Sequence, residues 1–174
     1  MRENFKASLD LVLAHEGGFQ SDSRDPGNAG GKCTNLGVTQ RVWEDYVGHS
    51  VDEKAMRRLT KEMVAPLYRK RYWNVCHCDD LPSGVDYLAF DFSVNAGSFR
   101  SIKTIQRALN ITADGVIGPV TLKAIQGANA EEFINNFTNA KEVFYRGLAN
   151  FPTFGRGWLN RVAESKKAAE EMIV

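Results

Sequence analysis

The sequence of 174 residues has little net charge, few prolines and cysteines, and no long apolar run. A formal net charge of +1 disfavours charge-driven binding to nucleic acid or anionic lipid, so we expect neither as a partner. No stretch reaches the roughly 18 apolar residues of a membrane span, and we expect no membrane insertion. The N-terminus lacks the apolar segment of a signal peptide, which predicts synthesis in the cytoplasm.

Cysteine is present at only three positions, Cys33, Cys76 and Cys78, and an odd number fits a reducing site of synthesis. The sequence Cys76-His77-Cys78 brings two thiols together, but its spacing is tighter than that of zinc-binding cysteine pairs. We therefore expect no metal and no cofactor.

An acidic residue at the end of an amphipathic segment is the most informative feature that is present. Phe5, Leu9, Val12 and Leu13 recur with helical spacing between Asn4 and His15. At about 100° per residue, Glu16 falls within about 20° of Phe5, close to the middle of the apolar stripe. The pair Gly17-Gly18 then ends the helix, because glycine accepts the left-handed conformation that is common after a helix C-terminus.

Glu16 at this position has the properties of a proton donor. Partial burial and the negative end of the helix dipole would both raise its pKa, and a protonated carboxyl group can protonate a leaving group. The alternative is a last-turn glutamate that reaches solvent. Asp25 follows in an Asp-Pro-Gly turn and Thr34 in a polar loop, and two carboxyl groups with a water-positioning hydroxyl suit glycoside hydrolysis. The alternative for Asp25 is capping of its own turn.

The N-terminal half resembles the glycoside hydrolase family 108 N-acetylmuramidases of phage endolysins and related bacterial secreted lysozymes. The family's Glu-Gly-Gly-aromatic motif appears as Glu16-Gly17-Gly18-Phe19, and its Asp, Gly and Thr run reads from Asp25 to Thr39. The resemblance implies a lysozyme-like, two-lobed helical fold, with Glu16 as the general acid and Asp25 and Thr34 as catalytic partners. A longer loop, Asn28 to Lys32, separates Asp25 from Thr34 in this chain.

The remaining periodicity predicts a mainly α fold, with room for one short β-hairpin between Gly31 and Thr39. Helices are expected over Gln40–Val47, with Thr39 as N-cap, and over Lys54–Tyr72, where Thr60 and Pro66 are candidate breaks. Basic and aromatic residues alternate at the end of the second helix. In a muramidase this predicts stacking of a sugar ring on Tyr72, and the alternative is packing at a helix end.

A nearly continuous apolar run over Val85–Ala96 predicts a buried helix. Asp91 and Asn95 are four residues apart on it, so both are candidates for substrate binding in a groove. The alternative is that they hydrogen-bond each other or a neighbouring helix inside the core.

The segment Asp114–Thr121 resembles small peptidoglycan-binding modules. We therefore expect a catalytic region at residues 1–90 and a C-terminal helical lobe at 91–174, packed as one globule.

These features predict a monomeric peptidoglycan hydrolase that cleaves the β-1,4 bond between N-acetylmuramic acid and N-acetylglucosamine. Its partners would be glycan strands, reached through a holin or an export system. A carboxyl separation of about 6.5–9.5 Å would indicate inversion, and about 5–5.5 Å a covalent intermediate. A lytic transglycosylase and a non-catalytic wall-binding module are the alternatives.

Overall fold

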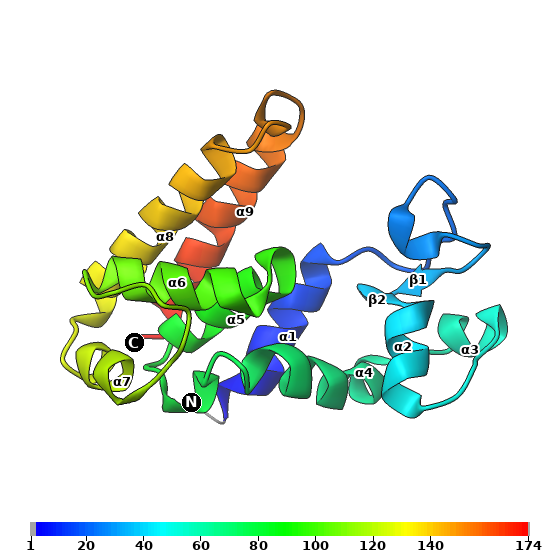
Figure 1. Ribbon diagram of the computed structural model, residues 1–174, viewed down its shortest axis with the longest axis horizontal. Helices are drawn as coiled ribbons and strands as arrows, with labels where there is room; N and C mark the ends of the chain where they lie inside the picture. The colour runs from blue at the N-terminus through cyan, green and yellow to red at the C-terminus, as the bar shows by residue number, and fades with distance from the viewer. Residues whose placement is uncertain (1–2, 174) are drawn as a thin grey trace. The chain divides into compact units, whose positions relative to one another are not determined.

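The computed structural model describes residues 3–173 and is mainly helical, with nine α-helices and one two-stranded sheet within that range (Figure 1). The chain divides into two compact units. One is Lys6–Lys70, here called the hairpin unit, and the other, here called the helical unit, contains the described residues up to Phe5 and from Arg71 onward. The first helix, α1 (Asn4–His15), begins in the helical unit and continues into the hairpin unit.

The hairpin unit is built around two short strands, β1 (Thr34–Asn35) and β2 (Val38–Thr39). They pair antiparallel, with Thr34 opposite Thr39, and Thr34 also forms an isolated bridge with Gln20. The connecting residues Leu36 and Gly37 have φ values of 49° and 70°. Positive φ at both central residues is the geometry of a tight hairpin turn, so the expected hairpin is present.

The helices of the hairpin unit agree with the sequence pattern except in its longest predicted segment. Helix α2 (Gln40–Val47) begins after Thr39, whose hydroxyl accepts a hydrogen bond from the Val42 amide. The segment predicted as Lys54–Tyr72 contains α3 (Glu53–Arg57) and α4 (Lys61–Tyr68), followed by a π-helix, η2 (Arg69–Trp73). Thr60 caps α4 and so marks a true break, whereas Pro66 lies inside α4 and does not end it.

The helical unit is organised by α5 (Val85–Ala96), whose first nine residues are all buried. Helix α5 contacts three of the later helices and the short 3-10 helix η3 (Cys78–Asp80). The later helices are α6 (Ser98–Ala108), α7 (Pro119–Gln126), α8 (Ala130–Arg146) and α9 (Phe151–Glu171). Helices α8 and α9 pack side by side along much of their length (Figure 1). The expected boundary between residues 90 and 91 falls inside α5.

An aromatic cluster fills the part of the helical unit that includes the start of α1. The rings of Phe5, Trp73 and Phe90 lie with centroids 5.2–5.9 Å apart. Within residues 3–173, no helix combines the length and the apolar character that a bilayer crossing requires.

Candidate functional site

Glu16 lies directly after α1, and its backbone N–H still bonds to the Val12 carbonyl at 3.2 Å. Its half-buried side chain reaches the β1–β2 turn. A Cβ atom on Gly37 would lie 2.9 Å from Glu16 Oε2 and 2.6 Å from the Tyr68 hydroxyl oxygen. Only a residue without a side chain allows the turn to pass this close to the carboxylate.

Tyr68 supports the same turn from α4. Its side chain is 1 % exposed, and its hydroxyl donates a hydrogen bond of 2.9 Å to the Leu36 carbonyl. The hairpin tip is therefore held by a buried tyrosine, next to the carboxylate of Glu16. The sequence did not indicate this contact, because Gly37 and Tyr68 are far from Glu16 along the chain.

The Gly17-Gly18 pair follows α1 as expected, but its conformation differs from the expectation. Neither glycine lies in the left-handed region, and a Cβ atom at either position would meet nothing within 4 Å. The helix therefore ends without a left-handed cap, and the prediction on this point is wrong.

Asp25 caps the short 3-10 helix η1 (Pro26–Asn28), which is the structural alternative considered for it. Its Oδ1 accepts a hydrogen bond from the Gly27 amide at 2.8 Å, and its Oδ2 accepts one from Gln20 Nε2 at 2.7 Å. A carboxylate has about four lone-pair sites. The two bonds therefore fix the orientation of Asp25 and leave acceptor capacity for a further donor.

Thr34 and Asp25 belong to one hydrogen-bonded network, although the Asn28–Lys32 loop separates them in sequence. Asn28 is wholly buried and joins them, since it accepts a bond from the Thr34 hydroxyl at 2.8 Å and donates to Gln20 Oε1 at 2.6 Å. Gln20 in turn donates to Asp25. Sequence reasoning missed Gln20 and Asn28, because neutral amides carry no chemical signature of their own.

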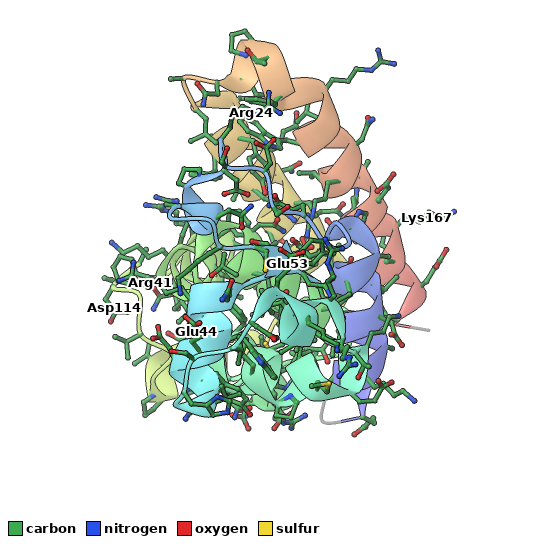
Figure 2. The ribbon with its side chains drawn as sticks, turned by 90° about the vertical axis from the view of Figure 1, so that its right-hand side faces the viewer. Arg24, Arg41, Glu44, Glu53, Asp114 and Lys167 are labelled. Carbon is green, nitrogen blue, oxygen red and sulfur yellow. The ribbon has the colours of Figure 1, made fainter. Side chains whose placement is uncertain are left out.

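An ion pair fastens the far end of the Asn28–Lys32 loop to α2. The ammonium of Lys32 binds the carboxylate of Glu44, one of the α2 side chains labelled in Figure 2. The hydrogen bond from Lys32 lowers the pKa of Glu44, and the bond that the Val51 amide donates to the same carboxylate lowers it further. The loop is thus anchored at both ends.

In the basic and aromatic segment at the end of α4, two of the three aromatic side chains are buried, whereas Lys70 and Arg71 are exposed. Trp73 is wholly buried and donates its indole N–H to Asp79 Oδ1 at 2.8 Å. The hydroxyl of Tyr68 donates its hydrogen bond to the Leu36 carbonyl at the hairpin tip. Tyr72, in η2, is half-buried, whereas Tyr68 and Trp73 are buried.

Asp91 lies inside the core and bonds to neighbouring helices, which is the structural alternative considered for it. It is wholly buried and bonds to Lys141 Nζ and to Arg161 Nη2, the latter at 3.0 Å. Burial acts to raise the pKa of Asp91, but the two cations outweigh it and hold the pKa below its ordinary value. The partners come from α8 and α9, and the helical pattern around Asp91 could not reveal them.

Asn95 is exposed, one turn further along α5. Its Nδ2 donates to the Asp91 carbonyl at 2.7 Å, and the same nitrogen lies 3.3 Å from Asp91 Oδ1. The two residues therefore bond to each other, as the structural alternative stated. Asn95 also lines a surface hollow, whereas Asp91 does not.

Comparisons with known proteins match both parts of the chain. Residues 9–97 match the glycosyl hydrolase 108 family, and residues 100–163 match a family described as a predicted peptidoglycan domain. A solved structure, that of Brucella abortus SagA, is similar over 99% of this chain and 97% of its own. The two are 34% identical, with a TM-score of 0.85. A search of curated proteins found no match. The protein therefore belongs to the glycosyl hydrolase 108 family and carries a C-terminal peptidoglycan domain.

Proposed function

We propose that the protein hydrolyses the β-1,4 bond between N-acetylmuramic acid and N-acetylglucosamine in peptidoglycan, with Glu16 as the general acid. Membership of a glycosidase family and the C-terminal peptidoglycan domain support the class of bond and the polymer. The observation that carries the proposal is the close approach of the Gly37 turn to the Glu16 carboxylate. The carboxyl group of Glu16 is half-buried, and the turn that it meets is held by the Tyr68 hydroxyl.

In this mechanism Glu16 gives its proton to the glycosidic oxygen as the bond to the muramic acid C1 breaks. Positive charge then develops on the sugar ring, and the carboxylate of Asp25 stabilises it. Water attacks C1 from the opposite face and loses its proton to Asp25, which yields a new reducing end with inverted configuration. The hydroxyl of Thr34 orients this water, and Asn28 fixes that hydroxyl.

Substrate contacts outside the hairpin unit are assigned to Tyr72 and Asn95. Both have exposed surface, and both carry groups that suit a sugar. Asp91 is not among the proposed contacts, because its charge is already balanced inside the core.

Replacing the proposed acid by its amide is the direct test. Glu16→Gln keeps the shape of the side chain and removes the transferable proton, so we expect hydrolysis to fall by about 10²–10⁴-fold. Reducing ends released from purified peptidoglycan measure the rate, and thermal unfolding shows that the variant is folded. Glu16→Gln with wild-type release of reducing ends would remove Glu16 from this role.

Mass spectrometry of the products made by the unmodified protein tests the type of reaction. Hydrolysis predicts muropeptides with a free reducing end. Products lighter by one water, with a 1,6-anhydro ring, would instead establish a lytic transglycosylase. Absence of any cleavage would favour a binding module.

A further inference from the structure

Two adjoining hollows open on the helical unit where α5 meets α6. The first has a volume of about 370 Å³, and its lining includes Asn95, Arg100 and Arg161. The second has a volume of about 330 Å³ and runs along α6 past Lys103 and Arg107. Both include Ala96 and Arg100 in their linings, so they form one continuous surface, here called the basic-aromatic surface.

Aromatic rings from three helices line this surface. In the first hollow Tyr145 and Trp158 are stacked, with centroids 5.4 Å apart and planes inclined by 24°. Phe144 lines the same hollow, and its centroid lies 5.3 Å from that of Tyr145. Phe99 lines the second hollow and is 61% exposed. Of these four rings Phe99 is exposed, Phe144 and Trp158 are half-buried, and Tyr145 is buried behind them. Partly exposed aromatic rings next to polar groups are typical of ligand-binding surfaces.

The charges of the surface are all positive. Arg100, Lys103 and Arg107 follow one another along one side of α6. Two of these cations lie over aromatic rings, with Arg100 Cζ 4.5 Å from the Phe144 centroid and Lys103 Nζ 4.6 Å from that of Phe99. Among the described residues that line the two hollows there is no aspartate or glutamate.

The α6 cations are also not neutralised by ion pairs. Within residues 3–173, none of the three has a carboxylate within salt-bridge distance. The carboxylate of Asp114 accepts hydrogen bonds from Gln106 and from the Val116 amide. These bonds lower the pKa of Asp114, and the charge of Lys103 adds a smaller effect in the same direction. The surface therefore presents positive charge toward solvent.

Arg161 has a fixed place in the first hollow. Its Nε and Nη2 lie 3.3 Å and 3.0 Å from Asp91 Oδ1, and its side chain is 18% exposed. Since Asp91 is itself buried and bound by Lys141, its ion pair with the Arg161 guanidinium fixes the position of that group in the lining of the hollow. Binding groups that are fixed in advance lose less conformational entropy when a ligand arrives.

We propose that the basic-aromatic surface binds a peptidoglycan strand, with sugar rings against the aromatic side chains and peptide-stem carboxylates on the α6 cations. The proposal rests on peptidoglycan being the substrate, but binding requires no turnover. It deepens the match of residues 100–163 to a peptidoglycan domain by naming the surface involved. Sugars offer apolar faces and hydroxyl groups, and the stems offer carboxylates, so both features of the surface have a use.

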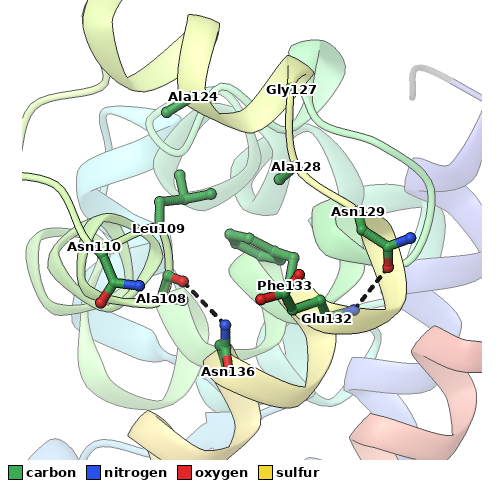
Figure 3. A pocket seen from close by; sticks show the side chains of 10 residues that line it. All are labelled: Ala108, Leu109, Asn110, Ala124, Gly127, Ala128, Asn129, Glu132, Phe133 and Asn136. Atoms are coloured by element: carbon green, nitrogen blue, oxygen red, sulfur yellow. Dashed lines mark hydrogen bonds between the residues drawn. The ribbon is translucent and has the colours of Figure 1, made fainter.

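Another hollow of the helical unit has the opposite character. It lies between α6, α7 and α8, has a volume of about 250 Å³, and contains Glu132 beside Phe133 (Figure 3). Asn129 and Asn136 in its lining are used by backbone bonds to Glu132 and Ala108. Its lining contains an acid and no basic residue, so it does not fit a polyanionic ligand.

Sedimentation with purified peptidoglycan sacculi tests the proposal in the full chain carrying Glu16→Gln, so that the polymer is not consumed. Arg100→Glu combined with Lys103→Glu should weaken binding at least about tenfold in low salt. The matched control, Lys123→Glu combined with Lys167→Glu, makes the same change in charge outside the hollows and should bind as the parent does. Arg100→Lys should restore most of the affinity lost in Arg100→Glu.

Raised salt should reduce parental binding and the difference between the two double variants, because exposed charges are screened beyond about 10 Å at 0.1 M. Equal binding by the two double variants would overturn the proposal, and so would failure of the parent to sediment with sacculi. Tighter, Arg100-dependent binding of a single-stranded oligonucleotide would overturn it in favour of nucleic acid. None of these results depends on hydrolysis, so the proposed activity stands or fails separately.

Discussion

At the scale of single residues, the candidate site depends on what one glycine lacks. Gly37 has φ of 70°, and its missing side chain leaves the space occupied by Glu16 Oε2 and the Tyr68 hydroxyl. A glutamate on an apolar stripe could be predicted from helical phase. The turn that meets its carboxylate could not, because that contact is set by tertiary structure.

Gly37→Ala should therefore reduce activity more than its effect on the backbone explains. Strain at positive φ costs about 1–2 kcal/mol, and the new methyl group would also displace Glu16 or Tyr68. A displacement of about 1 Å in a catalytic group can cost about a hundredfold in rate. Reducing-end release and thermal unfolding measure the two effects.

Gly31→Ala is the matched control, since Gly31 has φ of 78° but a Cβ atom there would meet nothing within 4 Å. The two variants share the backbone cost and differ in the contact with Glu16. An equal loss of activity in both would contradict the importance of that contact.

At the scale of elements, the local sequence predicts most of the helices and few of the contacts between them. The bounds of α1, α2 and α5 follow from apolar spacing, from the Thr39 cap and from flanking glycines. Pro66 is a candidate break in the sequence because proline has no backbone N–H to donate, yet α4 continues through it. Asp91 shows the limit most clearly, since its partner Lys141 is 50 residues away and lies on another helix.

The loop that carries Asp25 and the strand that carries Thr34 are joined by Asn28, so this residue should matter more than a surface asparagine. Asn28→Ala would leave the Thr34 hydroxyl and Gln20 Oε1 without a bond that each now makes. Such a loss costs about 1–3 kcal/mol, and we also expect lower activity because Thr34 is no longer oriented.

Chemical unfolding and reducing-end release compare this variant with Asn135→Ala, whose side chain is exposed on α8 and should change stability by less than about 0.5 kcal/mol. Similar values for both variants would show that the network does not hold the site together.

At the scale of the whole molecule, the buried cluster of Asp91, Lys141 and Arg161 makes the stability of the helical unit depend on pH. The folded-state pKa of Asp91 is below its unfolded value, which is about 3.9. The ionised carboxylate therefore contributes stability above that pH, and the contribution is lost as pH falls through the folded-state pKa.

Asp91→Asn should lower stability at neutral pH by about 3–5 kcal/mol, because Lys141 loses its buried counter-charge, and should reduce the dependence of stability on pH between about 2 and 5. The Trp43→Phe background leaves Trp73 and Trp158, both in the helical unit, as fluorescence reporters of unfolding. The free energy of unfolding is measured against pH for the Trp43→Phe protein with and without Asp91→Asn. Equal slopes in these two proteins would show that Asp91 does not govern acid unfolding.

Helix α5 also determines how the protein can be divided. The hydrolase family match ends at residue 97 and the peptidoglycan domain match begins at 100, so α5 belongs to the first by sequence. By packing it belongs to the second, since α6, α8 and α9 close around it. A fragment cut at the family boundary would leave Lys141 and Arg161 facing an empty core without their shared carboxylate. Any exchange of the C-terminal domain between members of this family must therefore carry α5 along with the domain that it supports.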